Sequence, residues 1–159
     1  MAQRPARSPR AGAKAPTMWG GLARGDRVVV DSAPLIYLLD GHPVFAPLFE
    51  GLFQAQEDGL LDICLSTIAL AEVLTGPLRH QQDALAKRYE KALAGFELVP
   101  VTQEIAVTAA RLRAGSGLRL PDAIQAATAL ETQAAALVTH DRDYSRLQGL
   151  KILLGQLEP

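Results

Sequence analysis

The sequence contains one cysteine and no long apolar run, and each shortage excludes a class of protein. A single cysteine, Cys64, cannot form an internal disulfide or a thiolate metal site, which fits a protein of a reducing compartment. No apolar segment approaches the roughly 20 residues that span a bilayer, and the N-terminus has no apolar core of signal-peptide length. We therefore expect a cytoplasmic protein with no membrane partner.

Several catalytic and cofactor motifs are also missing. The sequence has no G-x-G-x-x-G and no P-loop, which argues against a nucleotide cofactor. Neither Ser32 nor Ser66 has a histidine nearby in sequence to act as its base, so a hydrolytic triad is unsupported. A phosphotransferase of the Asp-x-Asp type is a rival interpretation, but Ala33 stands where its second acid is needed. The three histidines share no metal-ligand spacing: His42, His80 and His140.

The charge is unevenly distributed along the 159 residues, a length sufficient for one domain. Residues 1–27 carry six basic groups and one acidic group, whereas the remainder carries ten basic and sixteen acidic groups, so a basic arm precedes a body of net charge −6. Residues 1–25 are rich in Ala, Arg, Pro and Gly, which predicts a disordered arm; residues 26–157 form the predicted domain. Three interpretations of the arm stay open: an RNA-holding segment, a transit peptide, or residues preceding a true start at Met18.

Strands and helices alternate along the domain. The continuous apolar run at 28–30 predicts a strand buried on both faces, with further strands expected over 61–65, 96–101, 134–139 and 151–154. Between them we predict helices from Ser32 to Gly41, over 43–56, from 67 to a stop at Gly76-Pro77, and over 79–95, 102–114 and 122–133. This order predicts a three-layer α/β/α fold with a mostly parallel central sheet of four to five strands.

Acidic residues follow the strands of this predicted sheet. Asp31 ends the first strand, Asp122 opens a helix behind Pro121, and Asp141 and Asp143 follow the strand at 134–139. The carboxyl ends of parallel strands share one edge of the sheet, so these side chains are expected to meet there. Glu72, in the second turn of an apolar helix, points from near the same edge. Each aspartate alone also fits an ordinary helix start or loop.

Carboxylates that share one pocket need a cation. Two of them about 4 Å apart repel by roughly 4 kcal/mol at an effective dielectric of 20. Protonation or a divalent cation relieves that repulsion. Oxygen ligands without cysteine or paired histidines favour Mg²⁺ or Mn²⁺, which activates water and polarises phosphates.

Four segments, in this order, resemble the PIN-domain family of metal-dependent ribonucleases. They are VVVDSAPLIYLL, STIALAEVLTGP, LPDAIQAATAL and VTHDRDYSRL, and the resemblance covers residues 27–154. Within the family, the sequence is most similar to VapC-type toxins of type II toxin–antitoxin systems. The resemblance implies a Mg²⁺-dependent endoribonuclease that cleaves RNA phosphodiester bonds with metal-activated water, and a cognate antitoxin. Homodimers are common among such relatives, and the apolar segment 43–56 offers a surface for one.

The resemblance also implies roles for individual residues. The implied catalytic residues are Asp31, Glu72, Asp122 and Asp141, and the implied metal ligands are these four and Asp143. Whether Asp141 or Asp143 is the fourth ligand stays open. Thr139, with Ser32 or Ser66, is expected to assist by hydrogen bonding, and Arg111, Arg113 and Arg119 are candidate contacts to RNA phosphates. The alternative function is a catalytically inactive PIN-like module that binds RNA or a protein, and the sequence does not separate a toxin from a housekeeping nuclease.

Overall fold

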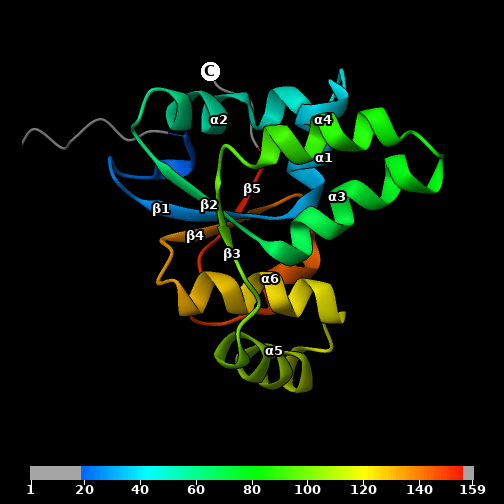
Figure 1. The fold of residues 1–159 in the computed structure, drawn as a ribbon. Helices are drawn as coiled ribbons and strands as arrows, with labels where there is room; N and C mark the ends of the chain where they lie inside the picture. Colours follow the sequence, from blue (N-terminus) through cyan, green and yellow to red (C-terminus); the bar gives the residue numbers. More distant parts are fainter. Residues whose placement is uncertain (1–18, 156–159) are drawn as a thin grey trace, which may run out of the picture.

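The computed structural model describes residues 19–155, in which a sheet lies between two layers of helices (Figure 1). The strand order is β3-β2-β1-β4-β5 and every pairing is parallel. The strands are β1 (Arg27–Val30), β2 (Asp62–Ser66), β3 (Glu97–Val99), β4 (Ala136–Thr139) and β5 (Ile152–Leu154). The predicted three-layer fold with a parallel sheet is confirmed, although β3 is shorter than expected.

The two faces of the sheet contact different helices. Val28 and Val30 pack into one core cluster and Val29 into the other, as alternation along a strand requires. The first face is covered by α1 (Ser32–Asp40), α2 (Glu50–Glu57), α3 (Thr67–Arg79) and α4 (Asp83–Leu93), and the second by α5 (Gln103–Ser116) and α6 (Leu120–Glu131). In the described part of the chain, no helix is long and apolar enough to cross a membrane.

The direction of winding reverses beside β1. From β1 the chain proceeds to β2 and β3 on one side, and α5 and α6 then return it to β4 on the other side of β1. Such a switch point leaves a crevice outside the carboxyl ends of the two flanking strands. Asp31 follows β1 and Thr139 ends β4, so both stand at that crevice.

The predicted disordered arm of residues 1–25 is wrong for its last part. Trp19 and Leu22 are only 4% and 1% exposed and belong to the core, where the Trp19 ring lies 6.1 Å from that of Phe49. The Ala23 N–H also donates a hydrogen bond to the Asp26 carboxylate at 2.8 Å. Residues 19–25 are therefore part of the domain. The rest of the predicted arm, and the predicted domain end at 157, lie outside the described residues.

Several predicted helix boundaries are also wrong. Gly76-Pro77 does not end α3, which continues to Arg79. A proline inside a helix removes one backbone hydrogen bond, but the Pro77 ring is buried in this protein, and that burial offsets the loss. Gln81 then adopts a positive φ of 56°, so the next helix begins at Asp83 rather than at residue 79.

The predicted helix 43–56 is interrupted, and its apolar stripe faces inward. A 3-10 turn over Ala46–Leu48 precedes α2, which begins at Glu50. Phe49, Leu52 and Phe53 are buried in the core of the domain itself. The dimer surface that was expected on this stripe is therefore wrong, while homodimerisation itself stays a prediction.

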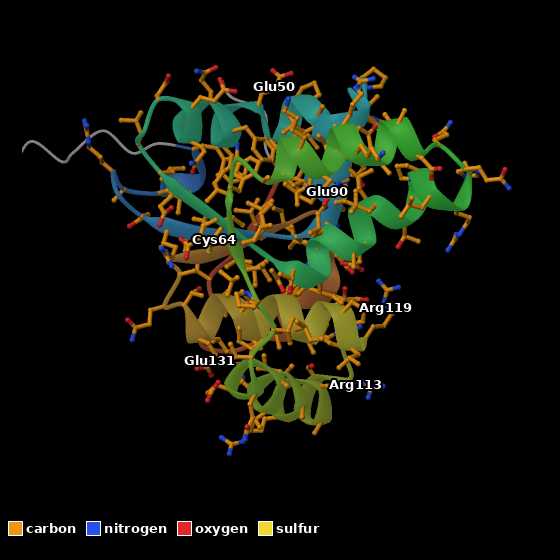
Figure 2. All side chains as sticks on the ribbon, in the orientation of Figure 1. Glu50, Cys64, Glu90, Arg113, Arg119 and Glu131 are labelled. Atoms are coloured by element: carbon orange, nitrogen blue, oxygen red, sulfur yellow. The ribbon has the colours of Figure 1, made fainter. Side chains whose placement is uncertain are left out.

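The single cysteine lies within the sheet (Figure 2). Cys64 is fully buried and its thiol donates to the Val28 carbonyl oxygen at 3.6 Å. Burial raises the pKa of the thiol to about 11. The thiolate, which is the reactive form, is thus almost absent at neutral pH.

Candidate functional site

Asp31 joins β1 to α1 at the centre of the crevice. It is the N-cap of α1, where one carboxylate oxygen accepts a hydrogen bond from the Ser32 N–H at 2.7 Å. The other oxygen accepts from the Thr139 hydroxyl at 2.8 Å. The side chain is only 5% exposed, and these bonds fix its direction.

The surroundings of Asp31 disfavour its charge. Burial raises the pKa of this carboxyl to about 6, with further raising by Glu72 and Asp122. The hydrogen bonds from Thr139 and Ser32 lower it, but by less. At neutral pH, Asp31 is therefore a buried anion that its protein partners do not fully stabilise.

Asp122 enters the site from the first turn of α6. Its neighbours on the helix are small: Ala123, Ala126, Ala127 and Ala129 are all fully buried, which lets α6 lie close to the sheet. The Asp122 carboxylate is 8% exposed. One oxygen accepts from Arg119 Nε at 3.1 Å and the other from the Tyr144 hydroxyl at 3.5 Å.

Glu72 reaches the site from α3 and is oriented by a residue that sequence reasoning missed. Gln125 is fully buried on α6, and its Nε2 donates to Glu72 Oε2 at 3.5 Å. Its Oε1 has no hydrogen-bond partner among the described residues. The sequence did contain a sign of this role. Gln125 is a polar amide in an alanine-rich helix, and its position three residues after Asp122 places it on the same inner face.

The structure separates the two acids that follow β4. The Asp141 N–H donates to Thr139 Oγ1 at 3.0 Å, and that hydroxyl holds Asp31. The Asp141 side chain caps a 3-10 turn over Arg142–Arg146. Asp143 is exposed and forms an ion pair with Arg146 at 3.5 Å. The Asp141 backbone is thus held beside Asp31 through Thr139, whereas the Asp143 side chain pairs with Arg146.

Tyr144 lies where the acids meet. Its side chain is fully buried, and burial raises the pKa of its phenol, with further raising by four carboxylates: Asp31, Asp122, Glu72 and Asp141. The four predicted acids 31, 72, 122 and 141 therefore all lie near this one phenol, while their role as metal ligands stays a prediction. We call these four residues the carboxylate cluster. By contrast, the Ser66 hydroxyl accepts the Ile68 N–H and caps α3.

A comparison with protein families matches this chain to the PIN domain over residues 28–150. The chain belongs to the PIN-domain family. All four members of the carboxylate cluster lie inside the matched range of this PIN domain, and the family predicted from the sequence is confirmed.

Solved structures of toxin–antitoxin proteins share the fold of this PIN domain. A toxin–antitoxin complex from Klebsiella pneumoniae is 28% identical, with a TM-score of 0.62 over 79% of this chain and 95% of that chain. VapBC2 from Rickettsia felis, bound to a DNA fragment from its promoter, is 18% identical, with a TM-score of 0.68 over 82% and 99%. VapC20 from Mycobacterium tuberculosis, a sarcin–ricin loop cleaving toxin, is 14% identical, with a TM-score of 0.61 over 74% and 92%. Among curated proteins, none matches.

The donor set of this PIN domain suits a hard divalent cation. Every polar side chain of the carboxylate cluster offers oxygen, which Mg²⁺ and Mn²⁺ prefer. Within residues 19–155, no three His, Cys, Asp or Glu side chains lie close enough together to hold one ion alone. Mg²⁺ commonly keeps several waters and binds one or two carboxylates together with substrate phosphates. The site fits such a loosely held ion and not a closed structural zinc site.

Proposed function

We propose that this PIN-domain protein is a Mg²⁺- or Mn²⁺-dependent endoribonuclease and the toxin of a toxin–antitoxin pair. The observation that carries the proposal is the buried, anionic Asp31, whose pKa is raised to about 6 by burial and by its acidic neighbours. An incompletely neutralised buried carboxylate gains more from a bound cation than an exposed one does, because solvent screens it less.

The carboxylate cluster would hold the cation, directly or through the waters of the ion. When bound, the ion would polarise a scissile phosphate and lower the pKa of an attacking water. The protein itself supplies orientation. Thr139 holds Asp31, Gln125 holds Glu72, and Tyr144 and Arg119 hold the two oxygens of Asp122. Asp141 is our choice for the fourth acid.

Two likenesses support RNA as substrate and an antitoxin as partner. The Klebsiella structure, which is 28% identical, is a toxin–antitoxin complex. The match covers 95% of that chain and 79% of this one. VapC20, which shares the fold, is a sarcin–ricin loop cleaving toxin. We extend both properties to this protein as part of the proposal.

Cleavage assays test the nuclease. Purified protein is incubated with end-labelled total RNA in Mg²⁺ or Mn²⁺, or in EDTA, beside Asp122→Asn, Asp141→Asn, Asp143→Asn and the exposed control Asp83→Asn. We expect EDTA and the substitutions at 122 and 141 to reduce cleavage by at least about a hundredfold, since transition-state charge stabilisation is worth several kcal/mol. Cleavage that survives EDTA and Asp122→Asn would reject the metal mechanism. If the wild type cuts no RNA, the inactive PIN-like module becomes the better description.

A growth assay tests the toxin. Induced expression of the wild type is expected to arrest bacterial growth, and Asp122→Asn is expected to relieve the arrest at equal protein level. Co-expression of a cognate antitoxin is expected to restore growth. Arrest by both forms would show that toxicity does not arise from the carboxylate cluster.

A further inference from the structure

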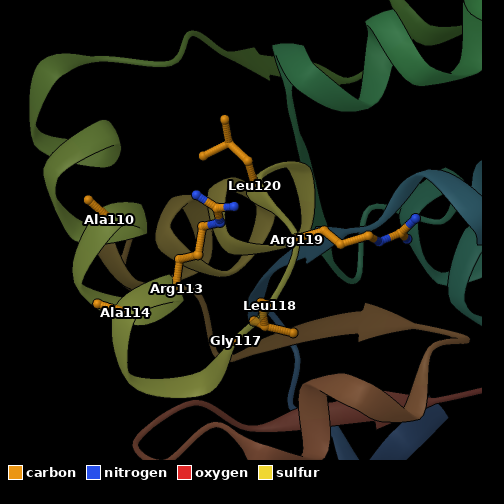
Figure 3. A pocket seen from close by; sticks show the side chains of 7 residues that line it. All are labelled: Ala110, Arg113, Ala114, Gly117, Leu118, Arg119 and Leu120. Atoms are coloured by element: carbon orange, nitrogen blue, oxygen red, sulfur yellow. The ribbon is translucent and has the colours of Figure 1, made fainter.

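A hollow of about 500 Å³ lies where α5 joins α6, beside the carboxylate cluster (Figure 3). The last turns of α5 and the start of α6 form its walls. Leu118, 5% exposed, contributes a buried apolar surface, and Leu120, 52% exposed, contributes an open one. Two arginines, Arg113 and Arg119, complete the lining. The hollow thus combines apolar walls with positive charge.

Arg119 connects this α5–α6 hollow to the proposed catalytic site. This residue belongs to the lining of the hollow, while its Nε donates to the Asp122 carboxylate at 3.1 Å. Figure 3 shows the Arg119 side chain extending away from Arg113 and Leu120. The same residue thus lines the hollow and contacts a member of the carboxylate cluster, so the hollow adjoins the proposed catalytic site.

Arg113 supplies a cation with no local counter-charge. It is exposed near the end of α5, and it takes part in none of the four ion pairs found within residues 19–155. The body of the protein carries a net charge of −6, so a polyanion that approaches the carboxylate cluster needs nearby positive groups. A free guanidinium suits a phosphate and also stacks on a base plane.

We propose that the α5–α6 hollow is a nucleotide subsite for single-stranded RNA. It takes one base of the strand next to the scissile phosphate, with Leu118 and Leu120 against the base and Arg113 against a flanking phosphate. The hollow has the size of known ligand pockets, roughly 300–1,000 Å³. A base enters such a hollow only when it is unstacked, which is how proteins read single-stranded RNA. The placement beside the scissile phosphate rests on the proposed nuclease function.

The test measures RNA binding with cleavage disabled. A fluorescein-labelled ten-nucleotide single-stranded RNA of mixed sequence is titrated with full-length Asp31→Asn protein, and fluorescence anisotropy gives Kd at several salt concentrations. Arg113→Gln is compared with Arg111→Gln, which removes the same charge from the same helix. Arg111, although the sequence made it a candidate RNA contact, lies outside the α5–α6 hollow and lines a different one next to Arg146, so it serves as the charge-matched control.

The expected signature differs between the variants. Arg113→Gln raises Kd by about five- to tenfold and reduces the slope of log K against log salt by about 0.7, the value for one lost single-strand phosphate contact. Leu120→Asn raises Kd by about fivefold and leaves the salt slope unchanged, because it removes an apolar contact. Arg111→Gln stays within about twofold. All three positions are exposed, and thermal unfolding verifies that each variant is folded.

Equal Kd and equal salt slopes for Arg113→Gln and Arg111→Gln overturn the subsite. Unchanged RNA binding combined with lost binding of the neutralising antitoxin also overturns it and assigns the hollow to a protein partner. The outcome for the nuclease is separate. If the wild type and Arg113→Gln cleave RNA with the same KM, the subsite is rejected and the nuclease is retained. If the wild type binds RNA through Arg113 but does not cleave it, the nuclease is rejected and the subsite is retained.

Discussion

Replacing Asp31 by asparagine is expected to stabilise the metal-free protein at neutral pH while abolishing its activity. The carboxyl has a usual pKa of 3.8 and a pKa of about 6 in the folded protein. Between these values the folded state binds more protons than the unfolded state, so stability falls as pH rises through this window. The difference corresponds to about 3 kcal/mol at pH 7.5. Asparagine resembles the protonated acid and is an equally good N-cap. Its pairing with Thr139 is less favourable than that of the carboxylate, so we expect the free energy of unfolding to rise by about 2 kcal/mol rather than by the full difference.

Urea unfolding in EDTA at pH 4 and pH 7.5 measures this effect. The free energy of unfolding of Asp31→Asn and of the wild type should be nearly equal at pH 4, and that of the variant should be higher at pH 7.5. In thermal unfolding at pH 7.5, the Tm of the variant should be higher by about 4–8 °C. Asp143→Asn, at an exposed ion pair, should change stability by less than about 0.5 kcal/mol at either pH. Saturating Mg²⁺ at about 100 times Kd should add about 2.7 kcal/mol to the wild type and less to the variant. Equal destabilisation of Asp31→Asn at both pH values in EDTA would refute the reasoning.

Three further predictions concern Tyr144, Gln125 and Trp19. Tyr144→Phe removes the hydroxyl that donates to Asp122, so we expect a loss of about 1 kcal/mol in urea unfolding and a lower kcat for RNA cleavage; unchanged kcat would show that this contact does not orient the acid. Gln125→Leu removes a buried acceptor without a partner, so stability should be equal or higher while activity falls because Glu72 loses its donor. A Gln125→Leu variant that loses both stability and activity would show that Gln125 has only a packing role. Trp19→Ala should cost about 3–5 kcal/mol; a cost under about 1 kcal/mol would place residues 19–25 outside the cooperative unit.

The parallel sheet was predictable because its signals are local and repeated. The continuous apolar run of β1 indicates burial on both faces, and β1, β2 and β3 are each followed directly by an α-helix. The failures arose where tertiary packing overrode a local preference. Trp19 and Leu22 sit among alanines, glycines and arginines, and only the finished core shows that they are buried. Pro77 continues its helix because its ring is buried, which no local rule for proline includes.

The candidate site shows the same division. Acids that follow strands were identifiable from topology alone, since the carboxyl edge of a parallel sheet gathers them. The choice between Asp141 and Asp143 was not, because it depends on a 3-10 turn in which the Asp141 backbone N–H bonds to Thr139 and the Asp143 side chain pairs with Arg146. Gln125 escaped notice because its contact with Glu72 spans 53 positions and two helices.

The buried Cys64 thiol gives the protein an internal reporter of global opening. With a pKa of about 11 and no exposed surface, the sulfur is shielded from alkylating and disulfide reagents while β2 stays paired with β1 and β3. Modification then requires separation of the central strands, so its rate under native conditions counts rare excursions to the unfolded ensemble. With a single thiol in the chain, every labelled molecule records such an excursion, and no engineered probe is needed.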